Sequence, residues 1–153
     1  MISSGKNPPG RILVAIDDSP YASAVMEKAA KLAYSTGSDV TILSVVPMPK
    51  LVASVGEINS ATVGEEDKDL VSLQKNLMDK FFTEPGILIE SKILHGDPAD
   101  KTCEYAERMQ ADMIVVGSRG RSKLTAALLG SVSGKIAHNC KCSVLIVKRS
   151  RQA

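Results

Sequence analysis

Short apolar runs alternate with helix-patterned segments along this chain of 153 residues. The first run, RILVAID at residues 11–17, is continuous, as expected of a strand that is covered on both faces. Further strands are expected at residues 39–46, 87–94, 112–117 and 143–148. The run at residues 87–94 carries Glu90 and Lys92, which favours an edge strand with one wet face. Strands that alternate with helices predict an α/β fold, in which helices cover both faces of a parallel sheet.

Capping residues mark the starts and ends of four expected helices. Ser19 with Pro20, and Asp97 with Pro98, each pair an N-cap residue with a proline in the first helical turn. Gly37 follows a helical pattern of apolar residues and is expected to end the first helix. The other two helices are expected around the apolar face Leu70, Leu73, Leu77 and Phe81 and over residues 131–139.

Length and composition favour one globular domain with an aliphatic core. We expect this domain over residues 11–148, with a flexible segment at residues 1–10 and a tail at residues 149–153. The net charge is only +2, and aromatic residues make up 3%, too few for a base-stacking surface. No uncharged apolar run approaches the roughly 18 residues of a membrane span, and residues 1–10 lack the apolar core of a secretory signal. We therefore expect a cytoplasmic protein that binds neither nucleic acid nor membrane.

The three cysteines, Cys103, Cys140 and Cys142, are an odd number in a chain long enough to need no disulfides. They predict free thiols in a reducing compartment. The segment HNCKC also contains His138, but zinc sites usually show a second pair of ligands, which this sequence lacks. A structural role is the main expectation, and a metal site or a redox pair at Cys140 and Cys142 are lesser alternatives.

A glycine cluster lies where this type of fold binds ligands, beyond the carboxyl ends of the strands. Gly117 and Gly120 follow the fourth expected strand, and Gly130 with Ser131 precedes the last expected helix. Glycine lets a ligand approach the main chain, and the first amides of a helix favour a phosphate. The cluster therefore predicts a phosphate site, although glycines that only form turns are the alternative. Polar and charged side chains that could contribute are Ser131, Ser133, Arg119, Arg121 and Lys123.

Two common nucleotide-binding motifs are absent from the sequence. GSVSGK is similar to a P-loop, but it has three residues rather than four between its glycines, and Ile136 follows its lysine. No G-x-G-x-x-G follows the first expected strand. A nucleotide would have to be held in another way.

The chain resembles the universal stress protein family from Arg11 to Lys148. The resemblance rests on the segments ILVAIDDS, HGDPAD, ADMIVVGSRGRS, LLGSVSGKIAHN and CSVLIV. Its most specific element is G-x2-G-x9-G followed by Ser or Thr, a motif of the ATP-binding members that Gly117, Gly120 and Gly130 match. The resemblance implies an open five-stranded parallel sheet in the order 3-2-1-4-5 with four helices, and ATP accompanied by Mg²⁺.

The resemblance also implies roles for individual residues. Asp17 would lie near the ribose or the metal, Val45 would pack on the adenine, and Val116 would border the nucleotide. The residues implied at the nucleotide and its phosphates are Ile16, Asp17, Val45, Val116, Gly117, Arg119, Gly120, Gly130, Ser131, Val132 and Ser133. Members of the family commonly dimerise through the last strand, here between Val144 and Val147. Family members often have a proline after the cysteine that precedes this strand, whereas Ser143 follows Cys142 here.

The remaining polar residues favour a binding domain over an enzyme. Asp18 is expected to be a solvated loop residue, and His95 a hydrogen-bonded loop histidine, with a ligand contact as the lesser option. No spacing predicts a catalytic nucleophile with its base, or a general base for ATP hydrolysis. We expect a nucleotide-dependent stress-response switch with at most slow hydrolysis, in which the loop over residues 47–64 reports the bound state. The alternative is an interaction or scaffold module of the same fold without a nucleotide.

Overall fold

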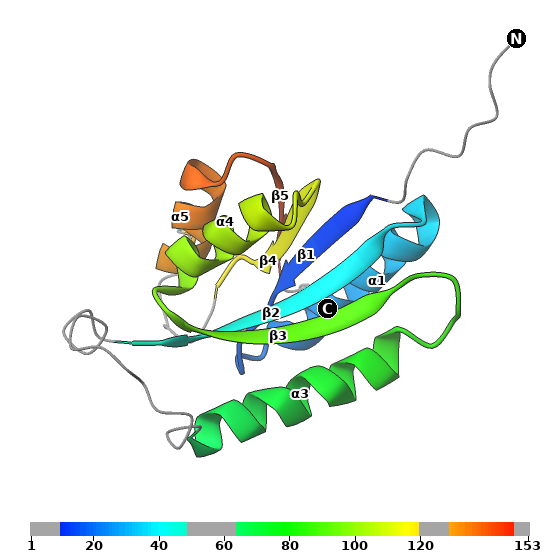
Figure 1. Ribbon diagram of the computed structural model, residues 1–153, viewed down its shortest axis with the longest axis horizontal. Coiled ribbons are helices and arrows are strands. Elements are labelled where there is room, and N and C mark those ends of the chain that lie inside the picture. The colour runs from blue at the N-terminus through cyan, green and yellow to red at the C-terminus, as the bar shows by residue number, and fades with distance from the viewer. Residues whose placement is uncertain (1–9, 49–63, 120–128, 149–153) are drawn as a thin grey trace, which may run out of the picture.

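A five-stranded parallel sheet is the centre of the molecule (Figure 1). The computed structural model describes residues 10–48, 64–119 and 129–148. Its strands are β1 (Arg11–Ala15), β2 (Asp39–Pro47), β3 (Ile89–Gly96), β4 (Met113–Gly117) and β5 (Ser143–Val147), paired in the order β3-β2-β1-β4-β5. Its helices within these ranges are α1 (Ala22–Thr36), α3 (Glu65–Phe81), α4 (Pro98–Arg108) and α5 (Ser131–Asn139). The predicted α/β fold and strand order are confirmed.

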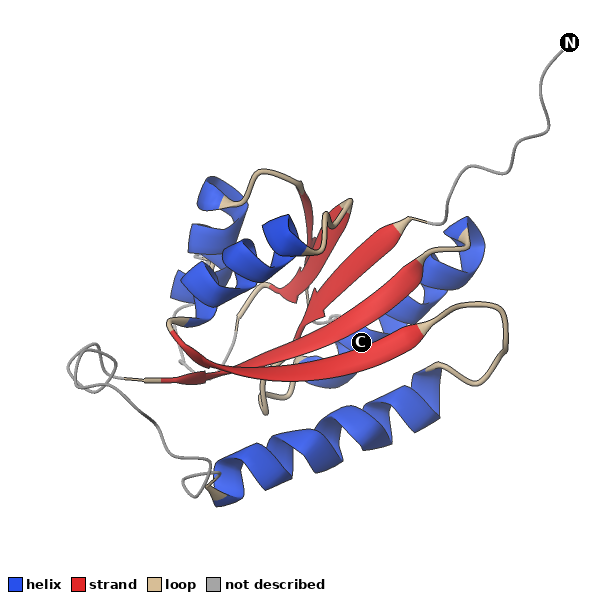
Figure 2. Ribbon diagram, in the orientation of Figure 1, coloured by secondary structure: helices blue, strands red, loops and turns tan. Residues whose placement is uncertain are grey.

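Two helices cover each face of the sheet (Figure 2). On one face, Ile12 and Val14 of β1 pack with apolar residues of α1 and α3. On the other, Leu13 of β1 packs with residues of α4 and α5, including Ile136. Leu13 and Val14 are both fully buried, because neighbouring side chains of the central strand point to opposite helix layers. This is why the first apolar run is continuous rather than alternating.

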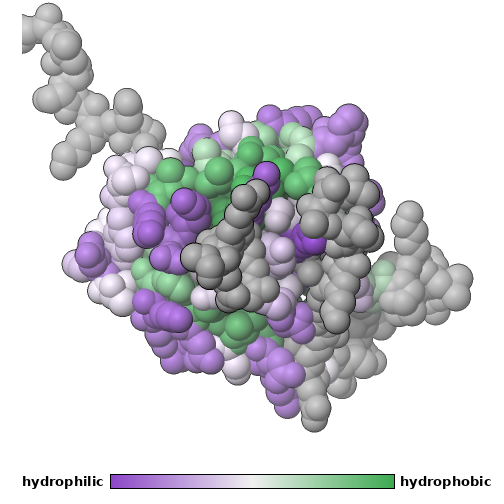
Figure 3. Space-filling model, turned by 180° about the vertical axis from the view of Figure 1, so that it is seen from behind, coloured by the Kyte–Doolittle hydropathy of each residue, from purple (hydrophilic) through white to green (hydrophobic). Residues whose placement is uncertain are grey.

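The outer surface mixes polar and apolar residues. On the face seen in Figure 3, green apolar areas are interrupted by purple hydrophilic ones. Among the described residues, no helix is both long enough and apolar enough to cross a membrane.

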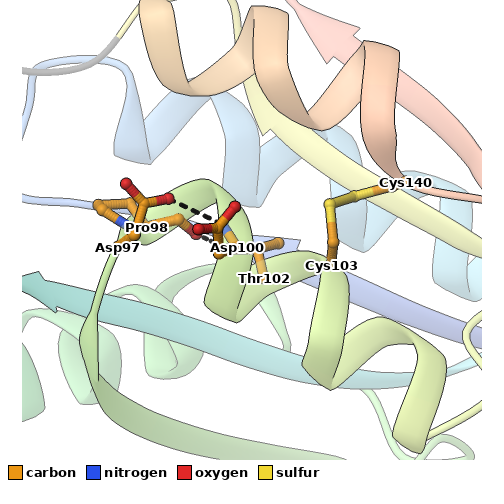
Figure 4. Close-up of a disulfide and its surroundings, with 6 residues drawn as sticks. All are labelled: Asp97, Pro98, Asp100, Thr102, Cys103 and Cys140. Atoms are coloured by element: carbon orange, nitrogen blue, oxygen red, sulfur yellow. Dashed lines mark hydrogen bonds between the residues drawn. A yellow bond between two sulfur atoms is a disulfide. The ribbon is translucent and has the colours of Figure 1, made fainter.

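The helix starts follow their predicted caps only in part. Asp97 caps α4 as predicted, since its Oδ1 accepts the Asp100 amide at 2.9 Å, and Pro98 begins the helix (Figure 4). The prediction that Ser19 caps the first helix is wrong, because α1 begins at Ala22 with Tyr21 before it. The Ser19 amide instead donates to Asp17 Oδ1 at 2.9 Å, so the chain makes a turn before the helix starts.

β3 is an outer strand of the sheet, as expected. Its Glu90, Ser91 and Lys92 are all exposed, so both faces of the strand are wet at this point rather than one. Under it lies Gln74 of α3, which is 2% exposed and donates from Nε2 to Ser44 Oγ and to the Lys92 carbonyl, both at 3.0 Å. This buried amide ties α3 to β2 and β3, and both protons of its NH2 group have acceptors.

The cysteines differ from the prediction of three free thiols. Cys103 of α4 and Cys140, which follows α5, form a disulfide with a Cα–Cα distance of 5.1 Å (Figure 4). Cys142 is the free cysteine. The pairing arises because α4 and α5 cover the same face of the sheet and so bring together residues that lie 37 positions apart. A redox pair of Cys140 with Cys142 is therefore not what the structure contains.

Several predictions fall on segments outside the described residues. They concern the N-terminal segment, most of the loop over residues 47–64, the C-terminal tail, and Gly120, Arg121 and Lys123.

We predict that Leu13→Ala lowers the free energy of unfolding by about 2–5 kcal/mol, because it removes a fully buried side chain from the middle of the sheet. Urea unfolding followed by circular dichroism measures the loss. Val71→Ala on α3 is the matched control, since Val71 is 54% exposed and its loss should change stability by less than about 0.5 kcal/mol. Equal effects at the two positions would contradict the assignment of the core.

Candidate functional site

A cavity of about 250 Å³ opens at the carboxyl ends of β1, β2 and β4. The chain runs from β1 outward to β2 and β3, then returns to place β4 on the other side of β1. Connections leave β1 and β4 in opposite directions, so a crevice forms between them, as in other open parallel sheets. The volume is close to the lower end of what small-molecule sites show.

The predicted site residues meet in this cavity wherever the structure describes them. Those that line it are Ile16, Asp17, Val45, Val116, Gly117, Arg119, Gly130, Ser131, Val132 and Ser133. Gly120 lies outside the described residues. Residues from four distant parts of the chain therefore share one surface. If the glycines only formed turns, there would be no reason for these residues to meet. Their binding roles remain predictions.

Gly117 and Gly130 lie where a side chain would make tight contacts with neighbouring atoms. A Cβ on Gly117 would lie 3.2 Å from Tyr21 Cβ and 3.2 Å from the Arg119 carbonyl oxygen. A Cβ on Gly130 would lie 3.3 Å from Arg119 Cα and 3.3 Å from the Ser118 carbonyl oxygen. Gly130 has a φ of −60°, so its conformation is open to any residue and the requirement is one of space.

The start of α5 is held against the end of β4 by the Ser118 carbonyl. This oxygen accepts the Gly130 amide at 2.8 Å and lies 2.9 Å from the Ser133 hydroxyl. Ser133 Oγ also lies 3.1 Å from the Gly130 carbonyl. A hydroxyl has one proton to donate, so Ser133 already has acceptors within the protein. Its structural role at this junction was not part of the sequence prediction.

The first turn of α5 presents amides to the cavity without a side-chain cap. Gly130 is the N-cap residue, no side chain caps the helix, and its first turn has no acidic residue. The first amides of an α-helix lack partners within the helix. Ser131 and Val132 are exposed at the cavity wall. An anion placed there would meet amide donors and the positive end of the helix dipole.

Asp17 and Asp18 differ in position. Asp17 lines the cavity, and its Oδ1 accepts the Ser19 amide. Asp18 is exposed and does not line the cavity. One carboxylate oxygen of Asp17 thus shapes the loop, and the side chain keeps further acceptor capacity toward the cavity.

Part of the cavity wall was missed by the sequence prediction. Val25 of α1, Leu70 of α3, and Pro98 and Thr102 of α4 also line it. The cap at Asp97 could have indicated α4, because it places a helix start directly after a strand. Nothing local distinguishes Leu70 from its neighbours on the apolar face of α3.

His95 is hydrogen-bonded, as predicted, although it lies in β3 rather than in a loop. Its Nε2 is 2.8 Å from Asp67 Oδ2 and 3.1 Å from Asp67 Oδ1. Asp67 belongs to α3, and its side chain is largely buried. The pair joins α3 to β3, and neither residue lines the cavity.

The Universal stress protein family matches residues 9–148 of the sequence. The chain belongs to the universal stress protein family. Universal stress protein MJ0531 of Methanocaldococcus jannaschii is 29% identical over 156 residues, which cover 99% of this chain and 89% of that protein. Universal stress protein YxiE of Bacillus subtilis is 32% identical over 150 residues, which cover 90% of this chain and 98% of that protein.

Solved structures show the same fold. Hypothetical protein MJ0577 superposes with a TM-score of 0.78 at 24% identity, covering 94% of this chain and 98% of that one. A universal stress protein in complex with cAMP gives 0.73 at 23% identity, with 92% and 98% covered. The universal stress protein from Archaeoglobus fulgidus in complex with dAMP gives 0.66 at 22% identity, with 91% and 98% covered.

We predict that Ser133→Ala lowers the free energy of unfolding by roughly 1 kcal/mol, because it removes a buried hydrogen bond to the Ser118 carbonyl. Chemical denaturation of both proteins measures the difference. Ser131→Ala is the control, since Ser131 is exposed on the same helical turn and should change stability much less. If both variants are equally stable, the hydroxyl of Ser133 does not hold the junction.

Proposed function

We propose that this universal stress protein binds an adenine nucleotide, ATP with Mg²⁺, in the cavity between β1 and β4. The observation that carries the proposal is the uncapped start of α5, which faces the cavity and is held close to the end of β4 at Gly130. Bound nucleotide would switch the protein between states in a stress response, with at most slow hydrolysis.

The phosphates fit the α5 end of the cavity. The amides of Ser131 and Val132 are available to oxygens there, and Arg119 lines the same end and can supply positive charge. Ser133 would have to exchange one of its internal acceptors for a phosphate, so we assign it first to the junction. Amide donors at this wall can bind phosphate oxygens without a P-loop.

The base and ribose fit the other end. Val45 and Val116 offer aliphatic surface for an adenine ring, and Leu70 adds to that surface from α3. Asp17 lies beside them and can accept hydrogen bonds from ribose hydroxyls. The arrangement leaves apolar contacts for the base and polar contacts for the sugar.

Magnesium would depend mainly on the nucleotide itself. No group of three His, Cys, Asp or Glu residues that could hold a metal occurs in the described part of the chain. Mg²⁺ is often bound by one or two carboxylates together with phosphate oxygens and water. Asp17 fits the role of such a single carboxylate. The ion would neutralise part of the negative charge of the phosphates.

Related structures support an adenine nucleotide without deciding which one. Two universal stress proteins of the same fold are complexes with cAMP and with dAMP. The described residues that line the cavity include no histidine, cysteine or lysine, which favours binding over catalysis. The simplest test is to denature the purified protein and identify any released nucleotide.

We predict that Gly130→Val abolishes binding at Mg-ATP concentrations that saturate the wild type. The added atoms would press on Arg119 Cα and the Ser118 carbonyl oxygen and push the start of α5 away from β4. Calorimetric titration measures binding, and circular dichroism checks folding.

Gly134→Val is the matched control for this experiment. Gly134 lies in the same helix, and a Cβ there meets no atom within 4 Å. The control should bind Mg-ATP as the wild type does. A folded Gly130→Val protein that binds equally well would disprove the phosphate site.

We predict that Asp17→Asn weakens Mg-ATP binding about tenfold to a hundredfold. A hydrogen bond to a charged group contributes roughly 1.5–3 kcal/mol, and its loss corresponds to that change in affinity. Asparagine keeps a side-chain oxygen for the Ser19 amide, so the loop is preserved while the charge is lost. Asp18→Asn serves as comparison and should have a much smaller effect, since Asp18 is outside the cavity lining. Equal small effects would mean that Asp17 only shapes the loop.

A second candidate function is an interaction module that dimerises through β5. This strand is the other outer strand of the sheet, and its Val144, Leu145 and Ile146 are only partly buried. An apolar outer strand favours pairing with a second copy. A dimer by light scattering, together with no released nucleotide and no thermal shift with Mg-ATP, would favour this function over nucleotide binding.

A further inference from the structure

The helices α4 and α5 run side by side in the same direction, with both starts at the cavity. Besides their apolar packing, two ion pairs and a disulfide link them, in the same order along both segments: Asp97–Lys135, Cys103–Cys140 and Glu107–Lys141. The first lies at the start of α4 and the last at its end. Movement of α5 along or away from α4 would have to break all three.

The disulfide is the strong member of this set. The Lys135–Asp97 pair is 3.8 Å apart, and the Lys141 and Glu107 side chains are 85% and 68% exposed. Exposed ion pairs contribute little and are screened by salt. The covalent bond between Cys103 and Cys140 is therefore the main lateral link between the two helices (Figure 4).

The disulfide joins a residue of α4 beside the cavity wall to the far end of α5. Cys103 follows Thr102, which lines the cavity and donates from Oγ1 to the Pro98 carbonyl at 2.6 Å. Cys140 is the C-cap residue of α5, which has only nine residues. Apart from the disulfide, α5 is anchored to the core chiefly by the buried Ile136 and Ser133. A helix this short gains most of its stability from such tertiary contacts.

We propose that Cys103–Cys140 is a reversible redox site that sets how firmly α5 is held at the cavity, and thereby sets the affinity for nucleotide. The affinity part rests on the proposed function of the cavity. With the bond closed, the amides at the start of α5 are held in place before a phosphate arrives. With the bond open, the nucleotide must order them as it binds, which costs affinity.

The reaction is an ordinary thiol–disulfide exchange with a dithiol reductant. One thiolate of the reductant attacks a sulfur of the pair and forms a mixed disulfide, releasing the other protein sulfur as a thiolate that takes up a proton. The second thiol of the reductant then displaces the first protein sulfur. The protein gains two thiols, and the reductant leaves as a cyclic disulfide.

The surroundings suit a site that waits for an external reductant. Cys103 and Cys140 are both partly exposed, so a small dithiol can reach them. Burial raises the pKa of the nearby Cys142 thiol, which keeps it protonated and makes it a poor attacking group. The Cys103–Cys140 pairing is thus protected from exchange with the third cysteine of the chain.

The test compares the full-length protein oxidised by glutathione disulfide with the same protein reduced by dithiothreitol. Alkylation after denaturation should find one free thiol in the oxidised protein and three in the reduced protein. Hydrogen exchange of peptides from α5 should be faster after reduction. Mg-ATP should bind roughly tenfold more weakly to the reduced protein, since ordering a few groups costs that much.

Two variants separate this site from general effects of reductant. The double variant Cys103→Ser with Cys140→Ser should behave like the reduced wild type and should not respond to dithiothreitol. Cys142→Ser keeps the disulfide and should respond as the wild type does.

Three free thiols after glutathione-disulfide treatment would overturn the proposal. So would a Cys142→Ser protein that has lost the response, or a reduction that leaves both α5 exchange and Mg-ATP affinity unchanged. If Mg-ATP binds neither form while reduction still speeds exchange in α5, the redox site is supported and the proposed nucleotide function is refuted.

Discussion

Parallel pairing of β1 with a neighbour on each side determines where the rest of the molecule lies. β1 pairs with β2 through Ala15 and Leu43 and with β4 through Ala15 and Val116, so these three strands end at one edge. Because the chain leaves β1 toward β2 and later returns to its other side, a crevice forms between the ends of β1 and β4. The position of the cavity follows from this topology, and the helices form part of its walls.

The Ser118 carbonyl converts that topology into a donor-rich wall. It accepts the Gly130 amide and faces the Ser133 hydroxyl, and so it fixes a helix start at a strand end. The glycine at position 130 allows the two main-chain segments to touch. The hydrogen bond to the Ser118 carbonyl and the absence of a Cβ on Gly130 thus bring the end of β4 and the start of α5 together, although they are separated in the sequence.

Features with a local physical signal were predictable from the sequence. The alternation of strands and helices predicted the fold, since each run carries its own period. The Asp97–Pro98 pair predicted the start of α4, because capping acts within one turn. The glycine spacing carried the family resemblance, which implied which residues would meet, and those within the described ranges do line one cavity.

Features that depend on contacts between distant elements were not predictable. Ser19 has the chemistry of a cap, but its hydroxyl oxygen accepts the Tyr21 amide in a turn, and the helix begins only at Ala22. The disulfide needs two helices to be neighbours on the same face, and cysteine counting alone favoured free thiols. Leu70 reaches the cavity only because α3 crosses the sheet at one particular place.

That place is defined by the buried amide of Gln74. Apolar side chains can pack with similar energy at many positions along a sheet, so a helix held only by an apolar face can shift along the sheet by a fraction of a turn. An amide that must meet both Ser44 Oγ and the Lys92 carbonyl tolerates no such slip. Leu70 lies one turn earlier on the same side of the helix, so it inherits this alignment. Gln74 therefore fixes the position of α3 along the sheet, and with it the place where Leu70 lines the cavity, although Gln74 is not itself a lining residue.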